Sequence, residues 1–262
     1  MTTIGKGLTM QRFRWLCWTI LICLLTVGAI QAQPLLQPDD SIFTRAEALR
    51  MMRAASRTLA PVYAPLAEHI VERFDLAGKE GIGIDLGSGP GTLIVELCKR
   101  TRLHWINAEI NPHFFPYFFQ KADKAGMGHR VSAVFADAQA LPFRNNYADI
   151  LVSRGSFHFW GEKILAFSEV RRVLKPGGIA FVGRGFSPNL PPAIAREVRA
   201  KQQRMPRYDV EETRSELRHL MSSIGIEDYQ IVTPRPPGSE GVNYGIWLEF
   251  RKSHRDPVPG RR

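Results

Sequence analysis

The feature that most constrains the fold of this chain is the stretch IGIDLGSGPG at positions 82–91. It begins as a short apolar strand and continues, after the glycines, into the apolar helical run Thr92–Leu97. The glycines at 87, 89 and 91 lack a Cβ, so the turn can take left-handed backbone angles and a ligand can approach the main chain closely. The free N–H groups of the following helix point into the same space. This order of elements predicts a nucleotide-like ligand at the turn.

The spacing of the glycines separates two classes of ligand. Dinucleotide-binding turns have the pattern G-x-G-x-x-G. This turn has the pattern D-x-G-x-G-x-G, with Thr92 in the place of the third glycine, and no basic residue stands in it to meet a phosphate. A dinucleotide-dependent oxidoreductase is therefore the least favoured of the function classes that we consider.

Apolar periodicity predicts strands that alternate with helices, closed by a final pair of strands. The expected strands are 81–86, 103–109, 131–136, 148–153, 179–184, 227–232 and 245–251, and the expected helices are 91–100, 112–125, 162–173 and 210–223. Two earlier helices, about 43–58 and 62–74, should cover the mouth of the ligand site, while 175–178 should stop a helix and turn. We expect a single α/β domain over 43–251: a Rossmann-like, mainly parallel seven-stranded sheet with helices on both faces.

The N-terminal segment 1–33 has the pattern of a targeting signal. Three basic residues precede sixteen residues without a charge, Trp15–Ile30. A small residue, Ala32, then stands just before the polar start of the expected mature chain. As a helix this run spans about 24 Å, short of the roughly 30 Å hydrocarbon core, which favours a cleaved signal over a permanent anchor. Ile30 stands where a cleavage site usually has a small residue, so an uncleaved anchor stays open. The charge pattern places the domain on the exported side. Residues 34–42 are the expected linker.

The net charge of +10 does not indicate a nucleic-acid partner. Residues 1–33 carry +3 and 251–262 carry +4, which leaves +3 for the residues between. We therefore expect no nucleic-acid groove, and a disordered basic tail over 252–262. Only Cys98 lies in the domain, so no disulfide can form within it, and no metal-ligand spacing is present. We expect Cys98 to be a buried thiol and the chain to hold no metal.

Carboxylates stand at three predicted strand ends, where an open α/β sheet binds its ligand. Asp85 precedes the glycine turn, Glu109 ends the second strand beside Asn111, and Asp137 follows the third strand beside Ala138. A carboxylate at position 109 can accept both hydroxyls of a ribose, and one at 137 can accept from an adenine amino group while the N–H of Ala138 donates to the ring. Three acids in this register indicate one adenosine site.

With these residues in place, the chain from about 45 to 182 resembles the small class I S-adenosylmethionine-dependent methyltransferases that include the ubiquinone/menaquinone methyltransferases. The matching stretches are DLGSGPG at 85–91, Glu109, DAQALPF at 137–143, YAD at 147–149 and EVRRVLKPGG at 169–178. The resemblance implies S-adenosyl-L-methionine as cofactor. It implies these cofactor contacts: Gly87, Ser88, Gly89 and Gly91 along the methionine, Asp85 at its amino end, Glu109 and Asn111 at the ribose, and Asp137 and Ala138 at the adenine. Tyr63 could touch the ligand or pack in the core.

The acceptor side of the predicted site is the stretch SRGSFHFW at 153–160. His158 could act as a general base or have no catalytic role. The aromatic residues around it could wall an apolar pocket or belong to the core, and Arg154 could meet an anionic group of the substrate or pair with an acid. Only a short proline-rich insertion, 187–192, follows the fifth strand, so a small acceptor is favoured over a macromolecule.

Two hypotheses follow for function. The first is a methyltransferase acting on a small, apolar acceptor; the second is a protein that binds S-adenosylmethionine or S-adenosylhomocysteine on the exported side of the membrane without turnover. The export pattern keeps the second open, because the cofactor is made in the cytoplasm. Translation from a later start would instead leave the domain cytoplasmic. A membrane contact is expected only through an uncleaved 1–33.

Overall fold

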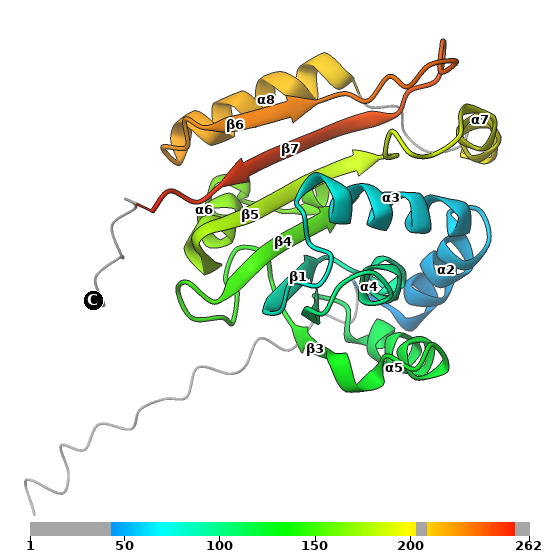
Figure 1. The fold of residues 1–262 in the computed structure, drawn as a ribbon, viewed down its shortest axis with the longest axis horizontal. Coiled ribbons are helices and arrows are strands. Elements are labelled where there is room, and N and C mark those ends of the chain that lie inside the picture. Colours follow the sequence, from blue (N-terminus) through cyan, green and yellow to red (C-terminus); the bar gives the residue numbers. More distant parts are fainter. Residues whose placement is uncertain (1–42, 203–208, 255–262) are drawn as a thin grey trace, which may run out of the picture. The chain divides into compact units, whose positions relative to one another are not determined.

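The computed structural model describes residues 43–202 and 209–254, and these form one seven-stranded sheet in the order β3-β2-β1-β4-β5-β7-β6 (Figure 1). The strands are β1 Ile82–Leu86, β2 His104–Glu109, β3 Val131–Phe135, β4 Ala148–Arg154, β5 Leu174–Gly185, β6 Tyr229–Val232 and β7 Gly245–Arg251. All pairings among β1 to β5 are parallel, and β7 runs antiparallel to both β5 and β6. The sheet is therefore mixed, and its parallel part matches the predicted alternation.

Successive side chains of a strand point to opposite faces of the sheet, and here both sets are apolar. Helices therefore cover both faces. The helices are α2 Arg45–Ser56, α3 Ala60–Arg73, α4 Thr92–Cys98, α5 Phe115–Lys124, α6 Lys163–Val173, α7 Pro192–Lys201 and α8 Val210–Ser223. One core lies under α3, α4 and α5, and a second lies under α6 and α8. Cys98 is buried in the first core, as predicted, and burial raises the pKa of its thiol to about 11.

Two predictions about the second half of the chain are wrong. The helix before residues 175–178 ends at Val173, as predicted, but these residues do not form a turn. Strand β5 already begins at Leu174, and these residues form a bulge in it, because Leu174 pairs with Ala148 while the next partners are Ile179 and Ile150. The stretch after β5 is also more than a short insertion, because α7 follows it. Its first turn starts with Pro192, a residue suited to that position, and Ala195 and Val198 pack beside Phe186.

The predicted segments 1–33 and 34–42 lie outside the described residues. Within the described part of the chain, no helix combines the length and the apolar character that crossing a membrane requires.

Helix α2 is capped by Thr44, whose hydroxyl accepts from the N–H of Glu47 at 3.2 Å. At the other end, Lys252 is buried and its ammonium donates to Asn146 Oδ1 at 2.8 Å.

Candidate functional site

The glycine turn after β1 lies where the strand order reverses, between β2 on one side and β4 on the other. In open α/β sheets this position forms a crevice at the carboxyl ends of the strands. The φ angles of Gly87, Gly89 and Gly91 are +69°, +55° and +66°, so all three are left-handed. A Cβ added at Gly89 would have no neighbour closer than 3.9 Å, and one added at Gly155, beyond β4, none within 4 Å. The backbone is thus open to a ligand on both sides of the reversal.

Glu109, at the end of β2, is tied to this turn. One of its carboxylate oxygens accepts from the N–H of Gly89 at 2.8 Å and the other from the N–H of Asn111 at 2.9 Å. Burial raises the pKa of Glu109, although these backbone donors favour the ionised form. A carboxylate has about four acceptor positions, so beyond its backbone donors it can still accept from a ligand.

Asn107 is a part of the site that the sequence analysis missed. It is fully buried two residues before Glu109 on the same face of β2, and its amide donates to the carbonyl of Gly89 at 3.0 Å. Its Oδ1 has no hydrogen-bond partner among the described residues. A lone asparagine in the apolar run of β2 was the available indication, since buried polar side chains need partners.

Asp85 is buried at the end of β1 and accepts from the hydroxyl of Ser88 at 2.7 Å. Burial raises the pKa of Asp85 to about 7, and the nearby charge of Glu109 adds to the shift, while Ser88 and Arg154 oppose it. Near neutral pH the carboxyl therefore carries only part of a charge. A cationic group placed beside it would favour the ionised form.

The remaining adenosine residues meet at the same edge of the sheet. Glu109 pairs with Phe135 in the β2–β3 ladder, so Asp137 follows two residues beyond its end. One oxygen of Asp137 accepts from the N–H of Gln139 at 2.9 Å, and Ala138 is buried. Asn111 is also buried, and its Oδ1 caps the short helix that follows by accepting from His113 N–H at 3.1 Å. Their contacts with a cofactor stay predictions.

Tyr63 reaches the site from α3, where burial raises the pKa of its phenol. The guanidinium carbon of Arg154 lies 5.3 Å from the centre of the Tyr63 ring. The charge of Arg154 lowers the pKa of this phenol, and the charge of Asp85 raises it. Tyr63 therefore lies beside the methionine end of the predicted cofactor site.

His158 lies in the short 3-10 helix Phe157–Phe159 beyond β4. Burial lowers the pKa of its imidazole to about 4, with further lowering by the charges of Arg184 and Lys163. Its Nδ1 is buried without a hydrogen-bond partner among the described residues. Of the three neighbouring aromatic residues, Phe157 and Trp160 belong to the core, whereas Phe159 is 74% exposed and its ring centre lies 4.0 Å from that of His158.

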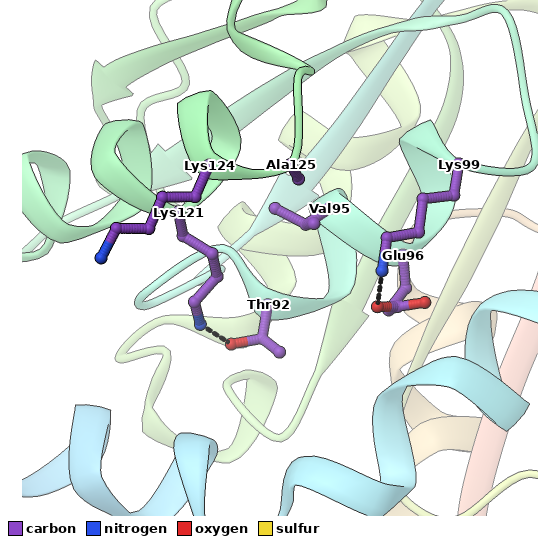
Figure 2. Close-up of a pocket in the computed structure, with 7 residues that line it drawn as sticks. All are labelled: Thr92, Val95, Glu96, Lys99, Lys121, Lys124 and Ala125. Carbon is purple, nitrogen blue, oxygen red and sulfur yellow. Dashed lines mark hydrogen bonds and ion pairs between the residues drawn. The ribbon is translucent and has the colours of Figure 1, made fainter.

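A separate open hollow of about 400 Å³ lies between α4 and α5 (Figure 2). Its lining is Thr92, Val95, Glu96, Lys99, Lys121, Lys124 and Ala125. Lys121 donates to the hydroxyl of Thr92 at 2.6 Å and Lys99 pairs with Glu96 at 2.6 Å. None of the predicted cofactor residues lines this hollow, so it is not the strand-end site. The described residues also contain no cluster of histidine, cysteine and acidic side chains that could hold a metal ion.

Comparison with known proteins agrees with this geometry. The family model described as "Methyltransferase domain" matches residues 84–182. A solved structure from Methanococcus maripaludis, described as an S-adenosyl-L-methionine-dependent methyltransferase, is 29% identical, with a TM-score of 0.72 over 82% of this chain and 95% of that one. Residues 84–182 thus match a methyltransferase domain, and the chain is similar to the class I S-adenosylmethionine-dependent methyltransferases. These matches support S-adenosylmethionine as the cofactor.

Two curated relatives match part of the methyltransferase. The 2-methyl-6-phytyl-1,4-hydroquinone methyltransferase of Arabidopsis thaliana is 30% identical over 44% of this chain and 33% of its own. The ubiquinone/menaquinone biosynthesis C-methyltransferase of Yersinia pestis is 33% identical over 42% of this chain and 44% of its own. The chain thus spans less than half the length of the curated relatives it matches.

The residues at the strand ends of the methyltransferase fit this cofactor. Two buried acids, Asp85 and Glu109, lie beside the open backbone of Gly89, and acids suit a ligand that carries a sulfonium and an ammonium. The orphaned Oδ1 of Asn107 adds one more acceptor in the same region. The site therefore offers acceptors where the cofactor carries donors and positive charge.

Proposed function

We propose that the methyltransferase transfers a methyl group from S-adenosylmethionine to a small, apolar acceptor that carries an aromatic ring. The observation that carries the proposal is the glycine turn where the strand order reverses, at which Gly89 is open and Glu109 is anchored to the same turn. The two curated relatives are named for hydroquinone and quinone methylation, which supports a ring of this kind as the acceptor.

The exposed ring of Phe159 next to His158 supports an acceptor on the β4 side. When bound, the cofactor supplies a methyl group already activated on a sulfonium. The chain then has to align the acceptor, exclude water and, where the acceptor must lose a proton, take that proton. His158 is neutral at physiological pH because its pKa is about 4, so it can accept a proton, but its low basicity makes it a weak base.

The test uses radiolabelled methyl groups and two variants. With S-adenosylmethionine labelled on the methyl, label should enter the organic phase when alkylated hydroquinones are supplied, and not when they are omitted. Glu109→Ala should bind S-adenosylhomocysteine about 10- to 150-fold more weakly in calorimetry, since a charge-assisted hydrogen bond contributes roughly 1.5–3 kcal/mol. Arg144→Met, at an exposed site stacked on Tyr147, is the matched control and should behave as wild type.

Binding without turnover is the competing function. It would be supported if S-adenosylhomocysteine binds normally while no label is transferred to any hydroquinone, phenol or catechol in the panel. For location, we propose that segment 1–33 directs the protein to export or to a membrane.

We also propose that α2 and α3 cover the cofactor site. The hydrogen bond from Asn111 Nδ2 to the carbonyl of Thr44, at 3.5 Å, supports this, since it joins the segment before α2 to the strand-end site.

A further inference from the structure

Arg154 is a charged residue of the site, and the proposed methyl transfer gives its guanidinium no ligand. In the parallel β1–β4 ladder, Asp85 pairs with Val152, so Arg154 follows two residues later on the neighbouring strand. Residues in register on parallel strands share a face, and so do residues two apart on one strand. Arg154 and Asp85 therefore lie on the same face of the sheet, the one covered by α3 and α4.

The guanidinium of Arg154 has no acidic partner among the described residues. Its Nε donates to the carbonyl of Gly185 at 3.3 Å, and its carbon lies 5.3 Å from the ring centre of Tyr63. A partly buried guanidinium carries five N–H donors, and a planar carboxylate is the group whose geometry suits them. These two contacts leave most of the donors of Arg154 for a ligand.

The spacing between Asp85 and Arg154 matches the two charged ends of one amino acid. Neighbouring strands lie about 4.8 Å apart and a strand rises about 3.3 Å per residue, which places the two Cα atoms roughly 8 Å apart. Two side chains on one face at this separation can reach, from opposite sides, an ammonium and a carboxylate that share one carbon. The cofactor carries this pair at the end of its methionine part.

A second arginine makes the assignment sharper. Arg184 stands near the end of β5, two residues after Val182, which belongs to the core on the opposite face. The charge of Arg184 lowers the pKa of His158, whereas the charge of Arg154 lowers the pKa of Tyr63 and of Asp85. The two arginines therefore lie on opposite faces of the sheet, and Arg154 is the one on the face of Asp85.

We propose that Arg154 binds the α-carboxylate of S-adenosylmethionine, with the ring of Tyr63 supporting the guanidinium from α3. Asp85 and Arg154 then form a pair of opposite charges that recognises the amino-acid end of the cofactor. The inference rests on the proposed function only in taking S-adenosylmethionine as the ligand; it does not depend on which acceptor is methylated.

The experiment compares ligands that differ only at this end. S-adenosylhomocysteine, its decarboxylated analogue S-adenosyl-3-thiopropylamine, and 5′-methylthioadenosine, which lacks the whole amino-acid part, are titrated into the full chain by calorimetry. Wild type should bind S-adenosylhomocysteine at least tenfold more tightly than the decarboxylated analogue. Arg154→Met should weaken S-adenosylhomocysteine 10- to 150-fold and change 5′-methylthioadenosine less than twofold, which removes the preference for the carboxylate.

The controls separate binding from folding. Arg154→Lys should keep part of the preference, because an ammonium pairs with a carboxylate through fewer hydrogen bonds. Arg144→Met again serves as the stacked arginine outside the site. The inference is overturned if wild type shows no preference for the carboxylate, or if Arg154→Met weakens all three ligands equally. Failure of wild type to bind S-adenosylhomocysteine at all would instead overturn the proposed function.

Discussion

At the scale of single residues, the site depends on acids that are buried before any ligand arrives. Asp85 is 2% exposed and Glu109 is 6% exposed, and burial raises the pKa of both. Such groups are costly to ionise in the folded protein. Near neutral pH the carboxyl of Asp85 thus keeps a proton part of the time, and a cationic ligand would displace it, which links binding and stability to pH.

The pH dependence of stability should therefore change in Asp85→Asn. The folded pKa of about 7 lies above the ordinary value of 3.8, so the folded state holds a proton that the unfolded chain releases. The resulting stabilisation is complete below about pH 4 and is lost as the pH rises through 7, by up to about 4 kcal/mol. Urea denaturation between pH 4 and 8 should show wild type losing more stability than the variant. Parallel curves for the two proteins would contradict this origin.

At the scale of elements, the glycine turn is held by the helices around it. A Cβ added at Gly91 would lie 2.0 Å from Cδ2 of Phe118, a fully buried residue of α5. At Gly89 the same addition makes only an ordinary contact at 3.9 Å, although both residues have left-handed angles. The close packing of α5 against the turn thus limits the side chain at position 91 and not at position 89.

Gly91→Ala and Gly89→Ala should consequently differ in stability. Both introduce a left-handed alanine, which costs about 1–2 kcal/mol, but only the first adds an overlap with α5 that costs about 1–3 kcal/mol more. Combining Gly91→Ala with Phe118→Leu should cost less than the two single changes together. Chemical denaturation measures all four free energies. Equal losses at 89 and 91, or full additivity, would show that α5 does not restrict the turn.

The elements show which features could be predicted from the sequence. The parallel strands and α8 followed from apolar periodicity, and Glu109 and Asp137 followed from their places at strand ends. Asn107 and Arg154 could not be placed in this way, because their roles depend on the register of neighbouring strands. The bulge at 175–178 depends on backbone hydrogen bonds with Lys252, more than seventy residues away. Local pattern contains none of this information.

At the scale of the whole molecule, the N-terminal segment outside the described residues carries a separate prediction. A reporter fused after Gln33 should leave the cytoplasm, and replacing Leu21 and Leu24 with arginine should stop it, since each arginine near the centre of an apolar helix costs about 2.5–3.5 kcal/mol of insertion. Arginines at Thr2 and Thr3, before the apolar run, are the matched control and should leave export intact. Cell fractionation measures both. A native fusion that stays cytoplasmic would refute the export proposal.

The position of β7 between β5 and β6 has a consequence for the order of synthesis. Strand β6 leaves the ribosome before β7, but its only partner in the described sheet is β7. The edge of β5 that pairs with β7 likewise stays open until β7 is made. Phe181 of β5 also lacks until then its stacking partner Trp247, whose ring centre lies 4.5 Å away in the folded protein. Open strand edges invite pairing with other chains.

Ribosome-bound chains should report this delay. Chains stalled with β6 exposed but β7 still inside the exit tunnel should be cut readily by a protease at low concentration, whereas chains stalled with residue 254 outside should resist it. Protection that is complete before β7 emerges would contradict the prediction. If the prediction holds, β6 and the outer edge of β5 wait unpaired for one late strand, and the interval is when a chaperone that recognises extended apolar segments has the most to bind.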